Sequence, residues 1–261
     1  MKTIIVCLCF VIIGSSSFAQ SFQSFDGTKI AYSDEGKGEA VLLVHGFINS
    51  SKNWNNTKLK QDLLKSGFRV IAPSLRGNGD SDKPQNEAAY ANNAEIKDLM
   101  LLMDHLNLKT YKALGYSRGS IVLAKLLTKD KRIGRAVLGG MGKDFTNPDW
   151  DRRIMFMHAF LGTQPLNSQT EGAVNYAKTQ NADLRALGLS QKYQPVTSPK
   201  ELSKIKTPVL VIAGDQDKDN GDPAELKALL KKGVLKTVPG VHNSTHTSQA
   251  FSDEVLAFLA L

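Results

Sequence analysis

A serine lies between two glycines in the segment Gly115-Tyr116-Ser117-Arg118-Gly119, directly after a predicted strand and directly before a predicted helix. This G-x-S-x-G pattern is typical of a nucleophile elbow, a turn so tight that side chains two positions either side of the serine would collide. The turn would present the serine hydroxyl at the N-terminus of a helix, where backbone N–H groups can stabilise a developing oxyanion. The segment therefore predicts a nucleophilic Ser117.

A serine nucleophile requires a general base, and the base requires a carboxylate to orient it. The carboxylate candidates are Asp215 and Asp217, in the sequence GDQD after a predicted strand, and Asp144 after the preceding strand. Two histidines near the C-terminus, His242 and His246, are the candidates for the base. The residue types thus allow a Ser-His-Asp triad but leave the choice of acid and base open.

Four motifs follow one another along the chain: HGF at 45–47, RGNGDSD at 76–82, GYSRG at 115–119, and GDQD at 214–217 followed by PGVH at 239–242. Together they resemble the α/β-hydrolase fold family, and the resemblance covers nearly all of residues 20–261. It implies that Ser117 is the nucleophile, Asp217 the acid and His242 the base. It also implies an oxyanion hole formed by the backbone amides of Phe47 and Arg118.

The resemblance also assigns roles to the other residues that are candidates for the acid and the base. His45 is expected to order the loop that carries Phe47, since the acting histidine of the family lies near the C-terminus. Asp215 is expected to cap or order its own loop. The RGNGDSD segment is expected to be structural, although Ser74 stands where the family often has an aspartate. A serine at position 117 argues against the dehalogenase and epoxide-hydrolase branches, which place an aspartate there.

The side chain that follows the serine departs from the family pattern. An apolar residue often stands there, whereas this chain has Arg118. Its guanidinium could bind an acidic or phosphate-bearing substrate, or it could pair with a neighbouring acid, which is the commoner use of arginine.

A metal site is not expected. The spacing His242-x-x-x-His246 resembles a pair of zinc ligands, but the glutamate of the H-E-x-x-H motif is missing. The chemistry expected of a serine triad also requires no cofactor.

The alternation of short apolar runs with longer helix-like stretches predicts a parallel sheet with crossover helices. With 261 residues and 41% hydrophobic residues, the chain is long enough for one large domain. The resemblance implies the α/β-hydrolase fold, with a mostly parallel sheet of roughly eight strands and helices on both faces, and this alternation agrees with it. The predicted strands cover 22–25, 28–33, 40–44, 69–72, 111–115, 135–138, 208–213 and 234–238.

Helical spacing of apolar residues predicts helices over 94–106, 120–128 and 252–261. Between about 143 and 200 no convincing strand occurs, and we interpret this interval as a helical lid insertion in a domain of residues 20–261. Trp150, Phe156 and Phe160 are candidates for lining a substrate cavity there, although packing onto the sheet explains most apolar residues of the interval.

The first nineteen residues have the features of a signal peptide: Lys2, an apolar run, and the small-x-small sequence SFA that ends at Ala19. The apolar run of about eleven residues is shorter than the ~20 that span a bilayer. We expect cleavage after Ala19, export to the periplasm or the medium, and no membrane anchor afterwards. Cys7 and Cys9 lie inside this segment, so residues 20–261 contain no cysteine and no disulfide.

The chain is basic, with a formal net charge of +8, which becomes +7 when Lys2 is removed with residues 1–19. Its lysines and arginines are spread along the sequence and no nucleic-acid motif accompanies them. We expect a small-molecule substrate and no nucleic-acid partner.

These observations predict a secreted serine hydrolase that cleaves a small to medium carboxylic ester through an acyl-enzyme. The same triad could instead act on amide or carbon–carbon bonds, or serve a lyase or perhydrolase reaction. A non-catalytic binding protein of the same fold is a further alternative. The complete set of Ser117, Asp217 and His242 argues against it.

Overall fold

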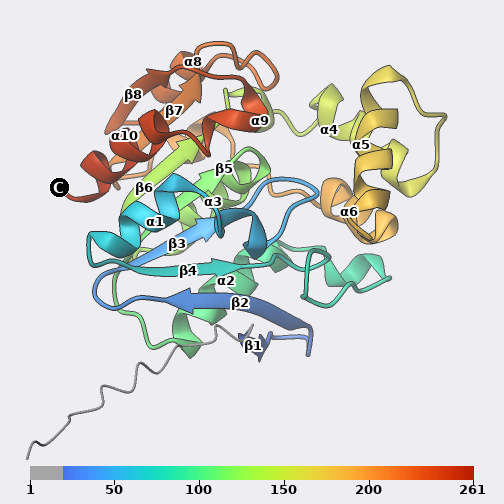
Figure 1. The fold of residues 1–261 in the computed structure, drawn as a ribbon. Coiled ribbons are helices and arrows are strands. Elements are labelled where there is room, and N and C mark those ends of the chain that lie inside the picture. Colours follow the sequence, from blue (N-terminus) through green and yellow to red (C-terminus); the bar gives the residue numbers. More distant parts are fainter. Residues whose placement is uncertain (1–19) are drawn as a thin grey trace, which may run out of the picture.

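The computed structural model describes residues 20–261, so the predicted signal peptide lies outside the described residues. Eight strands form one sheet in the order β1-β2-β4-β3-β5-β6-β7-β8 (Figure 1). The pairs β1–β2 and β2–β4 are antiparallel, and every other neighbouring pair is parallel. The prediction of a mostly parallel sheet of about eight strands is confirmed. The strands are β1 Gln20–Gln23, β2 Lys29–Glu35, β3 Ala40–Val44, β4 Arg69–Pro73, β5 Tyr111–Tyr116, β6 Ile133–Gly139, β7 Val209–Gly214 and β8 Gly233–Val238.

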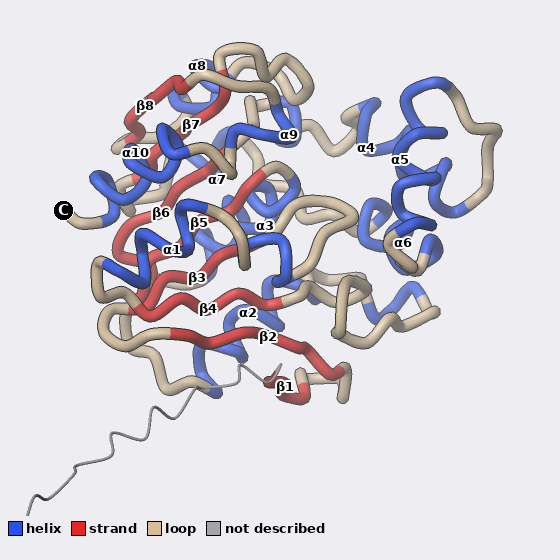
Figure 2. The backbone as a smooth tube through the Cα atoms, viewed as in Figure 1, coloured by secondary structure: helices blue, strands red, loops and turns tan. Residues whose placement is uncertain are grey.

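Helices connect the parallel strands and lie on both sides of the sheet (Figure 2). The α-helices are α1 Lys58–Lys65, α2 Ala94–His105, α3 Arg118–Lys129, α4 Asp151–Leu161, α5 Ser168–Thr179, α6 Leu184–Lys192, α7 Pro199–Leu202, α8 Pro223–Ala228, α9 His242–Thr245 and α10 Gln249–Leu259. Short 3₁₀ helices are η1 Ser51–Trp54, η2 Glu87–Ala89 and η3 Asp144–Thr146.

Strand β3 shows why the central strands read as continuous apolar runs. Leu42 and Val44 pack in the cluster that includes α2 and α3, whereas Val41 and Leu43 pack in the cluster that includes α1 and α10. Every residue of this strand is buried because successive side chains point to opposite faces and helices cover both.

Helix boundaries differ from the predicted ones where local hydrogen bonds decide them. Helix α10 begins at Gln249 rather than at 252, because the Ser248 side chain caps it by accepting a hydrogen bond from the Phe251 amide. Helix α3 begins at Arg118 rather than at 120, because the turn at Ser117 leads straight into it.

The segment between β6 and β7 contains η3 and α4 to α7, and no strand occurs in its residues 144–202, all of which the structure describes. Figure 1 shows α4, α5 and α6 beside the sheet, at the end toward which the arrows of β3 and β4 point. These helices pack in two small apolar clusters apart from the two that cover the sheet; one cluster contacts Phe47 and Ile48 of the loop after β3, and the other includes Tyr90. The role of this segment as a lid stays a prediction.

The loop after β4 is held by a buried ion pair. Arg76 is fully buried, and its Nε and Nη2 atoms each donate a 2.7 Å hydrogen bond to a carboxylate oxygen of Asp98. Its Nη1 atom lies 2.9 Å from Asp26 and also donates to the Ala89 carbonyl. Ser74, which replaces the aspartate of the family pattern, accepts a 3.2 Å hydrogen bond from the Ser51 amide. The RGNGDSD segment is therefore tied into the fold.

None of the helices within residues 20–261 combines the length and apolar character needed to cross a membrane.

Replacing Arg76 with Met should lower the free energy of unfolding by about 3–5 kcal/mol, because it leaves the Asp98 carboxylate buried without its partner. Thermal unfolding should show a midpoint lower by roughly 6–20 °C. Lys52→Met is the matched control, since it breaks an exposed 2.8 Å pair with Asp80 and should cost less than about 1 kcal/mol. Equal midpoints for the two variants would contradict this role of Arg76.

Candidate active site

The backbone at Ser117 adopts the strained conformation expected of a nucleophile elbow. Its φ is 54° and its ψ is −127°, a region that residues other than glycine rarely occupy. A Cβ atom on Gly115 would overlap the Gly119 carbonyl, and one on Gly119 would overlap the Val44 carbonyl at the end of β3. Glycine is therefore required at both positions because backbone segments approach closely there. This is the explanation that the G-x-S-x-G pattern suggests.

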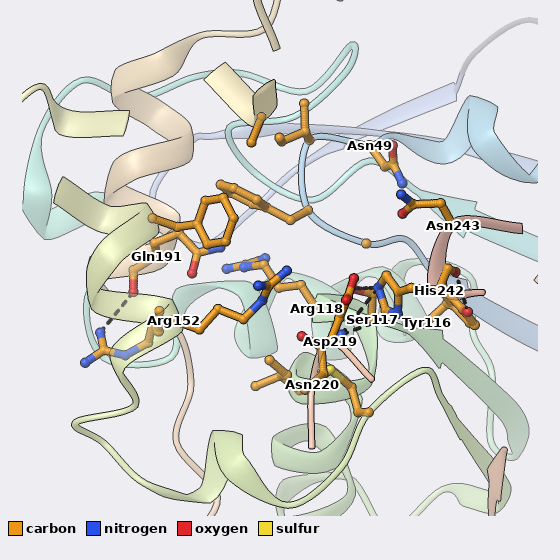
Figure 3. A pocket seen from close by; sticks show the side chains of 18 of the residues that line it. Asn49, Tyr116, Ser117, Arg118, Arg152, Gln191, Asp219, Asn220, His242 and Asn243 are labelled. Carbon is orange, nitrogen blue, oxygen red and sulfur yellow. Dashed lines mark hydrogen bonds between the residues drawn. The ribbon is translucent and has the colours of Figure 1, made fainter. Parts of the chain in front are cut away.

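A continuous chain of hydrogen bonds joins the three residues predicted for the triad, and Figure 3 shows its Ser117 and His242 part. The His242 Nε2 atom lies 2.9 Å from the Ser117 Oγ atom, and its Nδ1 atom lies 2.7 Å from an Asp217 carboxylate oxygen. The Asp217 side chain is 3% exposed and the His242 side chain 13% exposed. The imidazole thus connects an almost buried carboxylate with the serine hydroxyl, which faces the cavity.

Neighbouring groups that the sequence analysis did not identify hold His242 in place. The Tyr116 hydroxyl donates a 2.7 Å hydrogen bond to the His242 carbonyl. The Asn220 amide nitrogen lies 3.4 Å from both ring nitrogens of His242 and donates a 3.2 Å bond to the Gly140 carbonyl. Tyr116 occurs within the G-x-S-x-G motif, at a position that the motif leaves open, and no sequence motif singles out Asn220.

The loop after β3 lies against the elbow. A Cβ atom on Gly46 would lie 3.3 Å from the Ser117 Cβ atom. Within residues 20–261 the backbone amides of Phe47 and Arg118 donate no hydrogen bond. The two amides predicted for the oxyanion hole are therefore free of competing acceptors in the described part of the chain.

His45 orders this loop. Its Nδ1 atom lies 2.8 Å from the Gly46 carbonyl oxygen, and its Nε2 atom accepts a 3.0 Å hydrogen bond from the Leu75 amide. Burial lowers the pKa of His45 to about 4. The ring is therefore neutral at pH 7, with the proton on Nδ1, and it connects the loops after β3 and β4.

The other acid and base candidates lie outside the hydrogen-bonded triad. Asp215 accepts a 3.0 Å hydrogen bond from the Gly240 amide and so orders its own loop. The His246 ring packs on Tyr116 at 4.7 Å between ring centroids. No hydrogen bond connects Asp144 with His242 among the described residues. The geometry favours Asp217 and His242 over these alternatives.

The Arg118 side chain forms an ion pair. Its Nη1 and Nη2 atoms donate hydrogen bonds of 3.0 and 2.7 Å to the Glu95 carboxylate, and Nη2 also donates a 2.8 Å bond to the Ser190 carbonyl. The side chains of Arg118 and Glu95 are 4% and 5% exposed. Of the two uses predicted for this arginine, the structure shows the pairing with an acid.

A cavity of about 610 Å³ opens at Ser117, bounded by the ends of the strands and by α4, α5 and α6. Two of the three candidates for substrate contact, Trp150 and Phe156, line this cavity. Phe160 is 3% exposed and is not among the lining residues. Its ring packs 5.0 Å from that of Phe47, so Phe160 supports the cavity wall from behind.

The ligating atoms of Asp217, Asp219 and His242 lie within 4.8 Å of one another, the one group of potential metal ligands found in residues 20–261. The hydrogen bond between Asp217 and the His242 Nδ1 atom uses the proton on that nitrogen. A metal ion there would have to displace the contact that orients the histidine toward Ser117. This donor set therefore fits a triad better than a metal site.

Comparison with known proteins places the chain in a family. Residues 39–168 match the profile of the family described as alpha/beta hydrolase fold. A protein of Bacillus subtilis, provisionally named a 2-succinyl-6-hydroxy-2,4-cyclohexadiene-1-carboxylate synthase, is 34% identical over 254 residues, which cover 86% of this chain and 91% of that protein. The chain belongs to the α/β-hydrolase fold family, as its motifs predict.

Other matches are shorter or more distant. An uncharacterized protein of Mycobacterium tuberculosis is 35% identical over 130 residues, or 47% of this chain, and the chain spans about a third (36%) of its length. The solved structure of an esterase from Exiguobacterium antarcticum has a TM-score of 0.77 and 20% identity, covering 94% of this chain and 100% of that one. At that identity the likeness shows the fold alone.

Two histidines should make stability depend on pH. Burial lowers the pKa of His45 to about 4, and burial together with the nearby His242 lowers that of His246 to about 4. The unfolded chain protonates these histidines near 6.5, so the folded state loses free energy of unfolding as the pH falls from 6.5 to 4. Each histidine should contribute up to about 3 kcal/mol to that loss.

His246→Leu should remove one of these two contributions. We expect the difference in the free energy of unfolding between pH 7.5 and pH 4.5 to be smaller in this variant than in the unmodified protein, as measured by urea unfolding. An identical difference in both proteins would show that His246 is not held neutral by the fold.

Proposed function

We propose that the protein is a serine hydrolase that cleaves a small to medium carboxylic ester through Ser117, His242 and Asp217. The observation that carries this proposal is the unbroken chain of hydrogen bonds from the Asp217 carboxylate through both nitrogens of His242 to the Ser117 hydroxyl. This arrangement allows the histidine to accept a proton from the serine while the carboxylate stabilises the charge that develops on the ring.

The first half of the reaction forms an acyl-enzyme. The His242 Nε2 atom removes the hydroxyl proton of Ser117 as the serine oxygen attacks the ester carbonyl carbon. The electron pair of the carbonyl moves to its oxygen, which the amides of Phe47 and Arg118 stabilise by hydrogen bonds. The intermediate then collapses, the bond to the alcohol oxygen breaks, and the alcohol leaves with the proton from His242.

The second half releases the acid. A water molecule takes the place of the alcohol and gives a proton to His242 while its oxygen attacks the acyl carbon. The bond to the Ser117 oxygen breaks, and that oxygen recovers the proton from the histidine. Asp217 stays ionised throughout and keeps the Nδ1 proton of His242 in place.

The cavity supports a substrate of limited size. Its volume of about 610 Å³ falls within the range of ~300–1,000 Å³ usual for small-molecule sites. The rings of Phe47 and Phe156 meet edge to face at 5.9 Å on its wall, where they offer an apolar surface for an acyl chain or an aryl group.

A second candidate function is suggested by the Bacillus subtilis relative, whose provisional name makes it the synthase of a cyclohexadiene carboxylate. In that case the same three residues would serve a lyase reaction rather than transfer of an acyl group to water. Hydrolysis of a panel of p-nitrophenyl esters from acetate to palmitate distinguishes the two. Absence of turnover by folded protein would favour the lyase, amide or carbon–carbon alternatives.

Three substitutions test the triad. Ser117→Ala and His242→Ala should each lower kcat/KM for p-nitrophenyl esters by about 10⁴-fold or more, because the nucleophile and its base act together. Asp217→Asn should lower it on the order of 10⁴-fold, because an amide does not keep the histidine in the required tautomer.

The matched control is Asp215→Asn, in the same loop, since its amide oxygen can still accept the hydrogen bond from Gly240. It should leave kcat/KM within a few-fold of the unmodified enzyme. A fluorophosphonate probe should label the unmodified protein and Asp215→Asn but not Ser117→Ala. Labelling of Ser117→Ala, or equal losses from Asp215→Asn and Asp217→Asn, would refute the assignment.

Export of the protein is part of the proposal. Its support is the signal-peptide pattern of residues 1–19 together with the position of β1, in which Gln20 already pairs with Tyr32. Cleavage after Ala19 would leave the described sheet intact. The full-length chain expressed in a Gram-negative host should yield a periplasmic product whose intact mass corresponds to residues 20–261, and recovery of the uncleaved chain from the cytoplasm alone would argue against export.

A further inference from the structure

The cavity wall carries more positively charged side chains than negatively charged ones. Three arginines line it, Arg118, Arg152 and Arg153, whereas Asp219 is the carboxylate among the lining residues. Arg118 is neutralised by its ion pair with Glu95. The excess of positive charge therefore lies with the two arginines at the start of α4.

Arg153 is partly satisfied by backbone acceptors. It donates hydrogen bonds of 3.1 and 3.2 Å to the carbonyls of Gln191 and Lys192, and a further one to the Pro148 carbonyl. Its buried Nε atom has no partner among the described residues. These bonds fix the guanidinium in the wall but bring no negative charge to it.

The guanidinium of Arg152 has no such hydrogen-bond acceptors among the described residues. Among residues 20–261 it makes no ion pair and no hydrogen bond, and its guanidinium carbon lies 5.1 Å from the centre of the Phe156 ring. Figure 3 shows its side chain extending from α4 into the cavity, toward the side that holds Ser117. Asp151, its neighbour in the same turn, is exposed. Arg152 is thus a half-buried residue whose guanidinium faces the cavity and makes no hydrogen bond to the described residues.

The position of Arg152 in its helix makes this arrangement unfavourable without an anion. It is the second residue of the eleven-residue helix α4, and the N-cap residue Trp150 provides no side-chain cap. The N-terminus of a helix carries a partial positive charge that favours anions and disfavours cations. Arg152 and Arg153 add to that charge where burial already limits hydration, so a bound anion would stabilise this end of the cavity.

A carboxylate has the geometry that these donors require. The guanidinium offers two parallel N–H donors that match the two oxygens of a carboxylate, and the Phe156 ring fixes its plane. Gln191 and Gln194 also line this cavity, where side-chain amides can add neutral hydrogen bonds. Asp219 lies near the triad, since its amide is 3.3 Å from Asp217, and within residues 20–261 no ion pair joins it to Arg152.

We propose that the substrate is an ester with a carboxylate remote from the ester bond, and that Arg152 binds this carboxylate while the ester carbonyl lies at Ser117. The proposal rests on the hydrolase function for its chemistry but not for the anion site itself. Arg152 would then select acidic esters over neutral esters of the same length.

Two esters with chains of the same length test the selection: mono-4-nitrophenyl adipate, which carries a terminal carboxylate, and 4-nitrophenyl hexanoate, which does not. The ratio of their kcat/KM values, adipate ester over hexanoate ester, is the readout. Arg152→Gln should lower this ratio by about 10- to 100-fold, the usual effect of removing a charge-assisted hydrogen bond. Arg152→Lys should recover part of it.

The control variant is Lys178→Gln, which removes an exposed cation of α5 outside the cavity lining. It should leave the ratio unchanged, which separates the local effect from a change in overall charge. A ratio that is the same in Arg152→Gln and in the unmodified protein, with equal melting temperatures, would overturn the proposal. An equal fall in Lys178→Gln would also overturn it.

Binding of adipate to Ser117→Ala, measured by calorimetry, separates the anion site from catalysis. Adipate should bind this variant at least about 10-fold more tightly than it binds Ser117→Ala/Arg152→Gln. That result, found together with no hydrolysis of any ester by folded protein, would retain the anion site and reject the ester hydrolase function. If esters are hydrolysed but Arg152→Gln has no effect on adipate binding, the ester hydrolase function is retained and the anion site is rejected.

Discussion

The close packing of α3 against the ends of β3 and β5 is the constraint on which the rest of the site depends. It is possible only because Gly115 and Gly119 have no Cβ atom, since either one would overlap a backbone carbonyl. This packing holds Ser117 at a φ of 54° and brings the loop at Gly46 into contact with it. Because β3, β5, β7 and β8 run parallel, the loops that follow them meet at the same edge of the sheet. The residues predicted to supply the oxyanion amides, the nucleophile, the acid and the base therefore converge although they are far apart in the sequence.

Much of this could be predicted, because the central strands are buried on both faces and so read as apolar runs such as the one at 40–44. The nucleophile could be found because its turn needs glycine at two fixed positions. The positions of Asp217 and His242 came from the resemblance to a family rather than from spacing alone. Geometry then separates Asp217 from Asp215, since one carboxylate contacts the histidine and the other a backbone amide.

The parts that could not be predicted depend on contacts between distant segments. Helix α5 has few large apolar residues and buries only Thr170, Val174 and Ala177, so its pattern is weak. The partner of Arg118 is Glu95, which lies 23 positions earlier on another helix. Phe160 is a large apolar residue of the type that often lines a cavity, but its side chain packs against Phe47. This occurs because a helix presents only one side of its surface to the cavity. The composition of the sequence and the periodicity of its apolar residues do not predict contacts between such distant residues.

The separate packing of the helical segment has a consequence for how such an enzyme can diverge. Helices α4 to α6 bury Phe160, Leu187 and Leu189 in clusters that do not merge with those of the sheet. Substitutions on the cavity side of these helices therefore change the cavity wall while the turn at Ser117 and the strands keep their packing. The shape and charge of the cavity can thus change by gradual exchange of residues in one peripheral segment, provided that the contact of Phe160 with Phe47 and the hydrogen bond from Arg118 to the Ser190 carbonyl are kept.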